Sequence, residues 1–505
     1  MTSVRQPTST SVLRRMPATE ATVLRTAGLR EIYTRNDLIV LGLGVMIGAG
    51  IFSIAGRQAA SMAGPGVILS FMIAGITSLL AAICYAELCS TMPVSGSAYT
   101  YTYVIFGEVW AWIIGWSLIL EMELAAAVVA RVWSLYFAQM LTELGVTVPA
   151  LLSRPEGFDL FTLLILTTLT GIVAFNAKVG LRALWVMVSA KLVGISAVII
   201  IGSLHFNAGN IAQIPVDPAP LVTDADTLHS TVFGLLIGET HAFGWFGILA
   251  ATPAIAFAYL GFDIVTTAAE ETKDATRTVP QGMIRALATA TVIYIAVAVV
   301  MIGMVTYSKI TQGAPLADAF RLVGETFMVH VINITAVLGL TTVVFVLLVG
   351  QTRVVFAMAR DGLLPTQLAR LSGSHRTPAT ATLVIGAIAI LLAEFGPVLT
   401  LEQLVVIGTL FAFMIVSAGV ISMRRSMPDL PRGFKVPGSP LVPALSIVAT
   451  LWLMLNLQVI TWLYFVLWMA VGVLVYQLYG RRHSALAPTI GRHRRPQPPK
   501  HQTRT

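Results

Sequence analysis

Residues 44–52 read GVMIGAGIF and lie in the middle of the first long apolar segment of the chain. A glycine in a helix interior costs about 1 kcal/mol relative to alanine, so Gly44, Gly48 and Gly50 together predict an unwound stretch. Unwinding inside a membrane frees backbone N–H and C=O groups, which is tolerated only where they face a cavity or a ligand. Free N–H groups at the start of a half-helix attract a carboxylate, and free carbonyl groups attract an ammonium. Close packing of helices through small residues is the alternative interpretation.

A second interrupted segment follows five apolar segments later. It contains Pro253 and then the stretch FAYLGFD at 257–263, so a proline, a glycine and an acid interrupt an otherwise apolar helix. Interrupted helices at matching places in two halves indicate a transporter site formed by an inverted repeat. The first segment would begin one five-helix half, the sixth would begin the other, and two further helices would be appended.

The composition requires a membrane environment. Of the 505 residues, 56% are apolar and 11% are charged, whereas a soluble domain carries about 25% charged residues. Lipid is the solvent that tolerates such a chain. The basic residues cluster at the two ends and in short loops and form no basic face on a soluble domain, so we expect no nucleic-acid partner. Cys84 and Cys89 are expected to be free thiols packed in a helix.

Nothing in the sequence indicates catalysis. No histidine-rich metal spacing, nucleophile elbow or phosphate-binding loop is present, and motifs of those kinds are the ones that carry enzymatic chemistry. We therefore expect no enzyme activity, no cofactor and no metal site.

A hydrocarbon core of about 30 Å needs about 20 apolar residues in a helix. The sequence predicts an all-α integral membrane protein with about twelve transmembrane helices, at 37–57, 65–90, 105–140, 159–176, 181–203, 247–270, 283–307, 329–355, 378–395, 401–423, 440–457 and 459–480. The third helix is longer than the bilayer requires, at about 54 Å for 1.5 Å per residue, so it must tilt or project past the lipid. The last two are nearly contiguous and predict a tight hairpin.

The distribution of Lys and Arg predicts the orientation. With the N-terminus in the cytoplasm, most of the 32 basic residues fall on the cytoplasmic side. Those at the outer side are Arg57, Arg131, Arg154, Lys309 and Arg321. We therefore expect residues 1–36 to form a cytoplasmic N-terminal tail, 37–480 the transmembrane domain, and 481–505 a basic, disordered cytoplasmic C-terminal tail. No signal peptide is visible in the first 36 residues.

Lys191 lies near the centre of the fifth segment. A basic residue there costs about 2.5–3.5 kcal/mol on insertion scales, and both interfaces are about 15 Å away, too far for its side chain to reach water. Burial disfavours the charged form of an amine, and an amine that exchanges a proton can stand where another transporter holds a sodium ion. We expect Lys191 to couple transport to protons. The alternative is a structural lysine bonded to unwound carbonyl groups.

Three acids accompany these segments. Glu121 and Glu123 are two residues apart, so on a helix they point about 200° apart and do not share a face. For Glu121 a cation-binding role and structural capping are the alternatives. Glu87 ends the second segment at its cytoplasmic edge, where an ordinary surface role or a gating contact is expected.

Four stretches resemble the amino acid–polyamine–organocation superfamily, and more narrowly the bacterial members of the cationic amino acid transporter family. They are GVMIGAGIF at 44–52, AFAYLGFD at 256–263 with Glu270, Glu271 and Thr278-Val279-Pro280 after it, GQTRVVFAMARDGLLP at 350–365, and RRSMPDLPRGFKVPGSP at 424–440. The resemblance covers about 30–480. It implies the five-plus-five inverted-repeat fold of the leucine-transporter type, with broken helices 1 and 6.

The resemblance also implies site residues. The backbone N–H groups of Ala49 and Gly50 would hold a substrate carboxylate. The carbonyl groups of Met46, Phe257 and Leu260 would hold its ammonium. The substrate-binding residues are thus Met46, Gly48, Ala49, Gly50, Phe257 and Leu260, together with Glu121. Lys191 matches the lysine that replaces a sodium ion in proton-coupled relatives. The sequence LEME at 120–123 departs from the relatives, which usually show one acid followed by an aromatic residue.

These observations predict a secondary active transporter in a bacterial inner membrane. It would import an L-amino acid, either cationic or small and neutral, together with a proton. The rival functions are an amino acid–polyamine antiporter and, more weakly, a transport-like amino acid sensor. The expected partners are the amino acid, the proton and the lipid bilayer, and the sequence indicates no protein partner.

Overall fold

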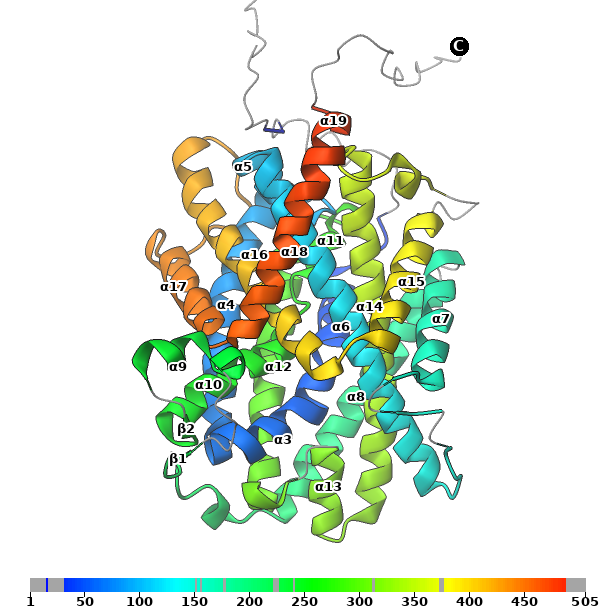
Figure 1. The fold of residues 1–505 in the computed structure, drawn as a ribbon, viewed down its shortest axis with the longest axis vertical. Coiled ribbons are helices and arrows are strands. Elements are labelled where there is room, and N and C mark those ends of the chain that lie inside the picture. The colour runs from blue at the N-terminus through cyan, green and yellow to red at the C-terminus, as the bar shows by residue number, and fades with distance from the viewer. Residues whose placement is uncertain are drawn as a thin grey trace, which may run out of the picture.

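The computed structural model describes the following residues: 15–16, 31–149, 152–154, 157–175, 179–220, 227–238, 241–310, 314–371 and 377–486. Most of both predicted tails, at 1–14, 17–30 and 487–505, lies outside these residues, so the expectations for the tails stay predictions. The described chain is nearly all helical (Figure 1).

The long helices are α2 (Arg35–Met46), α4 (Val67–Thr91), α6 (Glu108–Glu143), α7 (Leu160–Phe175), α8 (Val179–Leu204), α10 (Gly244–Ala256), α12 (Ala275–Met304), α14 (Thr326–Arg360), α15 (Ala379–Phe395), α16 (Val398–Ser426), α17 (Leu441–Leu455) and α18 (Val459–Val475). The short helices are α3 (Ala55–Gln58), α5 (Ser97–Ile105), α9 (Val232–Ile237), α11 (Ile264–Thr267), α13 (Pro315–Leu322) and α19 (Arg481–His483). The π-helices are Gly50–Ile54, Ala59–Ala63 and Tyr476–Gly480, and the two strands are β1 (Ala219–Pro220) and β2 (His241–Ala242), which pair antiparallel. The 3₁₀ turns are Gly64–Gly66, Ala208–Asn210, Thr227–His229, Phe257–Tyr259, Ala269–Glu271, Tyr307–Lys309 and Thr366–Ala369.

The prediction of about twelve membrane-spanning helices is confirmed. Eight helical stretches are long and apolar enough to cross a membrane, and one of them, Arg35–Thr91, holds the first two predicted helices. Three shorter apolar helices, α7, α15 and α17, complete the set. The predicted hairpin is present, because only 456–458 separate α17 from α18.

Several helix boundaries differ from the predicted ones, and two of these differences have a clear physical cause. The third helix begins at Glu108 because Gly107 has a φ of +101°, which only glycine adopts without strain, and this turn separates α6 from α5. α6 still has 36 residues, the predicted length. α12 begins at Ala275 rather than at 283, because its first turns carry polar residues and stand outside the apolar run on which the prediction rested.

The packing of the helices shows two related halves. Helices α2, α4, α6, α7 and α8 form the first half, and α10, α12, α14, α15 and α16 form the second. Several helix pairs recur between equivalent helices of the two halves: α2 packs on α8 as α10 packs on α16, and α8 packs on α14 as α16 packs on α6. Equivalent helices also meet directly, as α4 with α12, α6 with α14 and α7 with α15. Because each half crosses the membrane five times, the second half starts on the opposite side and is inverted.

The helices form two packing groups that enclose the middle of the molecule. In the first group α12 packs on α2 and on α4, and α4 packs on α10; in the second, α6, α7, α14 and α15 all contact one another. Outward-facing side chains are apolar, as on α8, where Val193 and Leu204 are 71% and 79% exposed. Such side chains suit a lipid environment.

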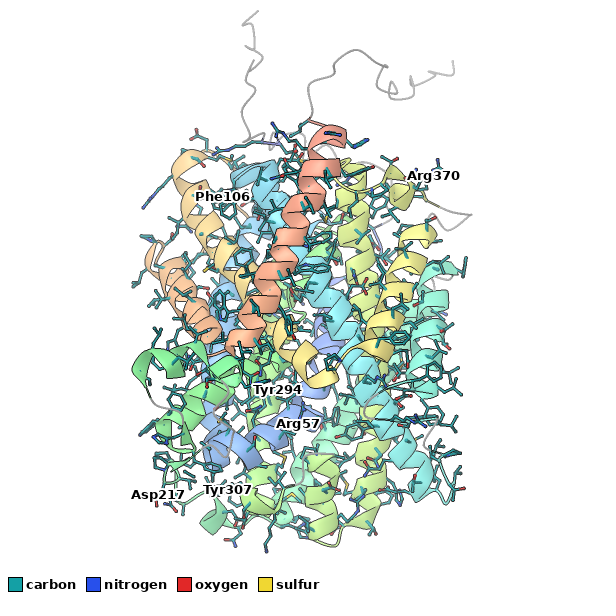
Figure 2. All side chains as sticks on the ribbon, in the orientation of Figure 1. Arg57, Phe106, Asp217, Tyr294, Tyr307 and Arg370 are labelled. Atoms are coloured by element: carbon teal, nitrogen blue, oxygen red, sulfur yellow. The ribbon has the colours of Figure 1, made fainter. Side chains whose placement is uncertain are left out.

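Both ends of the described transmembrane domain lie on one side. The hydroxyl of Tyr33 accepts a hydrogen bond from Arg353, and Ala485 N–H donates to the carbonyl of Asp361, so both ends meet the last turns of α14. Figure 2 shows Phe106 and Arg370 near this end and Asp217 and Tyr307 near the other. Below, the end of the molecule that carries Arg370 is called the inner end and the opposite one the outer end.

Candidate functional site

The first helix breaks at Ile47. α2 ends at Met46, Ile47 has an extended backbone (φ −74°, ψ 90°), and helical structure resumes as the π-helix Gly50–Ile54. Outside the hydrogen bonds within helices, none of the described residues' backbone hydrogen bonds uses the N–H of Ala49 or Gly50 as a donor, and both groups stand at the start of the resumed helix, where N–H groups have no partner within the helix. N–H groups at the start of a half-helix are a binding site for an anion, because the dipoles also favour negative charge there. The break is therefore suited to a carboxylate.

The sixth helix breaks at Leu260. α10 tightens into the 3₁₀ turn Phe257–Tyr259, Leu260 is extended (ψ 146°), Gly261 has a φ of +98°, and α11 begins only at Ile264. The carbonyl of Phe257 accepts a hydrogen bond from the N–H of Leu260 at 3.3 Å. The carbonyl oxygens around this break are oriented by the turn and not by a continuous helix, so they can meet a cationic group.

The two breaks contact each other through glycine. A Cβ atom on Gly50 would lie 2.2 Å from the Cβ and 2.4 Å from the Cα of Ala258, and one on Gly261 would lie 2.5 Å from Val45. No side chain larger than hydrogen fits at Gly50, because one of the obstructing atoms is backbone. The glycines thus do both things that the sequence left open: they allow the break and they allow close packing.

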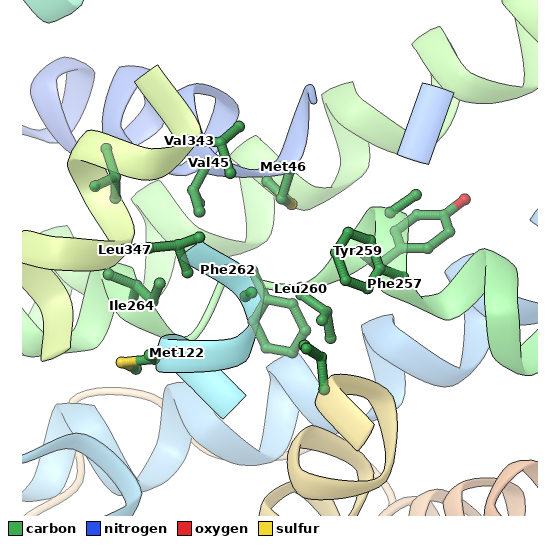
Figure 3. Packing of buried hydrophobic residues seen from close by; sticks show 14 of the residues in the cluster. Val45, Met46, Met122, Phe257, Tyr259, Leu260, Phe262, Ile264, Val343 and Leu347 are labelled. Carbon is green, nitrogen blue, oxygen red and sulfur yellow. The ribbon is translucent and has the colours of Figure 1, made fainter. Parts of the chain in front are cut away.

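A small cavity lies where the breaks meet. Its volume is about 20 Å³, room for about one water molecule. It is lined by Val45, Met46, Ala49, Gly50, Ala125, Val129, Phe257, Leu260, Val343 and Leu347. Figure 3 shows side chains of Val45 and Met46 on one side, Val343 and Leu347 beside them, and Phe257 and Leu260 across from them. All side chains of the lining are apolar.

The cavity brings together most of the predicted substrate-binding residues. Met46, Ala49, Gly50, Phe257 and Leu260 line it. Gly48 lies beside the cavity, where it packs against Val343 of α14. Ala125, Val129, Val343 and Leu347 were not named from the sequence, because an apolar residue that lines a cavity has the same composition signal as one that faces lipid.

Glu121 does not line the cavity. It is 2% exposed on α6, packs beside Gly408 of α16, and interacts electrostatically with the buried Asp263 next to the second break. Glu123 points to another face of α6, as expected from the two-residue spacing, and meets the side-chain amide of Gln351 on α14. The structure thus separates the two acids and gives each a different helix as its neighbour.

Lys191 is fully buried on α8 and bridges three helices. Its ammonium group donates to the carbonyl of Gly44 at 2.8 Å, to the carbonyl of Ile47 at 3.0 Å, and to the hydroxyl of Thr342 on α14 at 2.8 Å. An ammonium has three donors, so every proton has an acceptor. The lysine therefore holds carbonyl groups at the first break and joins them to α14.

At the outer end an ion pair joins the first half to the second. Arg57 follows the first break on α3, and its guanidinium lies 2.7 Å from the carboxylate of Glu402 on α16. The hydroxyl of Tyr136 on α6 donates to the carbonyl of Phe52 at 2.8 Å and holds the same half-helix. Arg57 and Glu402 are 345 residues apart in the sequence, and Phe52 and Tyr136 are 84 residues apart. No local pattern in the sequence indicated either contact.

At the inner end the segment before α2 is tied to the loop after α11. The N–H groups of Ile32 and Tyr33 donate to the carbonyl of Glu271, and the carboxylate of Glu271 lies 2.8 Å from Arg353 of α14. The neighbouring carboxylate of Glu270 accepts two hydrogen bonds from Ser95, each of 2.9 Å. These contacts join the segment before α2 to α14 and to the loop after α11.

Glu87 forms a second group of contacts at the inner end. It is fully buried, and its carboxylate accepts hydrogen bonds from Arg424 at 2.8 and 2.6 Å and from the N–H of Val436 at 2.6 Å. A two-point contact of this kind is among the stronger hydrogen-bonded pairs. Glu87 thus joins α4, α16 and the loop before α17, rather than standing at an ordinary surface.

No group of three or more His, Cys, Asp or Glu within the described ranges is placed to hold a metal ion. The site consists of two discontinuous helices that meet at the midpoint of a bundle, and this arrangement defines the class of secondary membrane transporters. The particular family follows from comparison with known proteins: a model of the Amino acid permease family matches residues 35–477, and the chain belongs to this family. It is a multi-pass membrane transporter and not an enzyme.

Individual relatives cover nearly the whole chain. The chain is 39% identical over 483 residues to the methylthioribose transporter of Bacillus subtilis, covering 94% of this chain and 99% of the relative. It is 38% identical over 459 residues to the branched-chain amino acid permease BcaP of the same organism, covering 89% and 93%. It is also 33% identical over 408 residues to the cationic amino acid transporter 3, mitochondrial, of Arabidopsis thaliana, covering 79% and 63%. These similarities agree with the resemblance that the sequence motifs carry.

Proposed function

We propose that the protein imports a neutral L-amino acid with an aliphatic side chain together with a proton. The observation that carries this proposal is the cavity between the two breaks. Ala49 and Gly50, whose backbone N–H groups stand at the start of a half-helix, line a cavity whose side chains are all apolar. Backbone dipoles suit the charged ends that every amino acid shares, whereas the lining selects the side chain.

The apolar lining supports the neutral alternative over the cationic one. A cationic side chain in this cavity would lose its water and meet no acid, since Glu121 is directed away toward Asp263 and α16. Burial of an unpaired charge costs several kcal/mol at least. The similarity to a branched-chain amino acid permease supports the same choice.

Lys191 supplies the coupling in this proposal. As an ammonium it holds the carbonyl groups of Gly44 and Ile47, and as a neutral amine it has one donor fewer and holds them less well. Loss of the proton therefore loosens the first break from α8 and α14. A break that is held in one protonation state and released in the other links the proton to the conformation of the carrier.

The contacts at the two ends act as gates in this proposal. The Arg57–Glu402 pair closes the outer end, and the contacts of Glu271 and Glu87 close the inner end. Between them the cavity of about 20 Å³ is smaller than an amino acid, so binding must widen it. Alternating access then requires that the two ends open in turn, by motion of one helix group against the other.

The proposed setting is the bacterial plasma membrane with both termini in the cytoplasm. Basic side chains support this orientation, because Arg353, Arg360, Arg424 and Arg432 gather at the inner end. In the same proposal residues 1–36 and 481–505 are cytoplasmic tails of the transmembrane domain 37–480.

The test is uptake of labelled leucine into proteoliposomes with and without an inward proton gradient. The proposal expects saturable uptake that the gradient stimulates, and competition by leucine, isoleucine and valine. Arginine, lysine, a polyamine and methylthioribose should compete at least about tenfold more weakly, as expected for a pocket that leaves a charge or a polar group unpaired. Competition by arginine as strong as by leucine would overturn the assigned side-chain class.

The rival functions give different outcomes in the same vesicles. An exchanger transports labelled substrate only when the vesicles are preloaded, whereas a symporter also fills empty vesicles. A sensor binds substrate but shows neither counterflow nor uptake.

A further inference from the structure

The inner end of α16 carries two adjacent arginines with different surroundings. Arg424 is held by Glu87, with 2.6 Å between the guanidinium and the carboxylate, and Arg432 approaches the same carboxylate at 3.5 Å. Arg425 is one residue further along, about 100° around the helix, and is exposed. Within the described chain it forms no ion pair, and Asp429 in the loop after α16 is itself exposed and lies beyond salt-bridge distance.

Arg425 lies at the mouth of a groove between α16 and α17. The groove has a volume of about 460 Å³ and is lined by Ala418, Ile421, Ser422, Arg425, Ser426 and Ile447. The lining residues of α16 change from apolar to polar along the helix. Ala418 and Ile421 make the end nearer the middle of the membrane apolar, whereas Ser422, Arg425 and Ser426 make the inner end polar. The hydroxyl of Ser426 donates to the carbonyl of Ser422 at 2.9 Å, so its proton is already used within the helix.

We propose that this groove binds one anionic phospholipid of the inner leaflet, with the headgroup phosphate on Arg425 and an acyl chain along Ala418 and Ile421. The inference rests on the proposed orientation, which places the inner end of α16 in the cytoplasmic leaflet. Basic grooves between transmembrane helices on that side bind anionic headgroups. A guanidinium pairs with a phosphate through two parallel hydrogen bonds, and the hydroxyl of Ser422 can supply one further donor.

The proposed lipid site lies next to the contact between Arg424 and Glu87 at the inner end. Arg425 and Arg424 lie in the same last turn of α16, and Arg424 holds Glu87 of α4 at the inner end. A phosphate held by Arg425 fixes this turn from the lipid side, while Glu87 fixes it from the protein side. The bound lipid therefore stabilises the closed inner end.

The test measures lipid binding and does not depend on transport. Purified protein is titrated with phosphatidylglycerol or with phosphatidylcholine and examined by native mass spectrometry. The expected result is one retained phosphatidylglycerol at concentrations where phosphatidylcholine is lost. Arg425→Gln should weaken phosphatidylglycerol binding about fivefold, the effect of one basic residue on an anionic surface. Arg482→Gln removes an exposed arginine of α19, outside the groove, and should leave binding unchanged.

A second variant and a competitor separate the remaining outcomes. Ala418→Leu fills the apolar part of the groove while Arg425 stays, and it should also weaken the binding of phosphatidylglycerol. Thermal unfolding of both variants in detergent without added lipid should match that of the unmodified protein. Equal retention of phosphatidylglycerol by Arg425→Gln and the unmodified protein would overturn the site. Displacement of the lipid by millimolar inorganic phosphate would also overturn it, since the groove would then be a site for free phosphate.

Discussion

The ammonium of Lys191 donates to the hydroxyl of Thr342 at 2.8 Å, and this hydroxyl lies 2.9 Å from the carbonyl of Gly44, which accepts from the same lysine. The three groups form a closed triangle between α8, α14 and the first break. The lysine is thus not merely buried near the break but shares an acceptor with the helix across from it. Any change in the charge of Lys191 acts on both partners at once.

The first prediction concerns the hydrogen bonds between Lys191, Thr342 and the carbonyl of Gly44. Lys191→Ala should lower proton-driven uptake at least about tenfold. Thr342→Val keeps the shape of the side chain but leaves one donor of the ammonium unpaired. It should lower uptake about fivefold, since an unpaired buried donor costs about 1–3 kcal/mol. Uptake into proteoliposomes with a pH gradient is the measurement. Thr335→Val is the matched control, because that hydroxyl bonds only within its own helix. Unchanged uptake by Lys191→Ala, still stimulated by the gradient, would rule out coupling through this residue.

The second prediction concerns side-chain size. Ala125 lines the cavity from α6, and Ala125→Val adds two methyl groups where space is already short. The variant should bind leucine at least about tenfold more weakly and alanine nearly as before, because one methylene in an apolar pocket is worth about 1–3 kcal/mol. Competition of each amino acid against labelled alanine measures the ratio. Ala127→Val changes another buried residue of the same helix that does not line the cavity, and it should leave the ratio unchanged. An equal loss for leucine and alanine would contradict a role of Ala125 in selection.

The third prediction concerns the outer end. Arg57→Glu and Glu402→Arg each place two like charges where the structure has an ion pair of 2.7 Å, so each should lower uptake several-fold. The double variant restores opposite charges and should recover a large part of the loss. The coupling energy should be about 1 kcal/mol, since the pair is partly exposed. Strictly additive losses in the double variant would show that the pair is not a unit of the gate.

The sequence predicted those parts of the structure that depend on local composition. The apolar runs gave the number of helices, and the glycines at 44–50 together with Pro253 and Gly261 gave both breaks, since a helix is weakened by its own residues. The sequence did not predict α9, α13 or α5, which are short and lie in connecting segments. It also gave no indication of Arg57 with Glu402 or of Arg353 with Glu271, because a pairing between distant segments leaves no local pattern.

The same distinction applies to the candidate site, where some groups follow from local composition and others do not. The backbone groups around Ala49 and Gly50 follow from a glycine-rich stretch in lipid. The side chains opposite them, such as Val343, belong to helices whose apolar residues serve lipid, packing and cavity alike. Glu121 was a candidate because an acid in a membrane helix is rare. That reasoning does not distinguish an acid facing substrate from one facing Asp263.

The last prediction contrasts two arginines at the outer side. Arg131 is 2% exposed; its guanidinium lies 3.4 Å from Asp159 and 3.6 Å from Glu394, and it also donates to the carbonyl of Ala393 at 2.7 Å. These contacts tie the outer parts of α6, α7 and α15 together. Arg131→Gln would leave two buried carboxylates without their cation, and breaking a buried pair in this way costs about 3–5 kcal/mol. The variant should therefore unfold at a clearly lower temperature in detergent.

Arg321 supplies the matched comparison. Its side chain is 46% exposed and lies 2.8 Å from Glu143, so the distance is shorter than either ion-pair distance of Arg131. Exposed pairs contribute about 0–1 kcal/mol, because water and salt screen them. Arg321→Gln should therefore leave the unfolding temperature nearly unchanged, although it removes the closer contact. Equal shifts of the unfolding temperature in both variants would show that burial does not make the ion pairs of Arg131 stabilising. The outer junction of α6, α7 and α15 would then be held by its apolar packing instead.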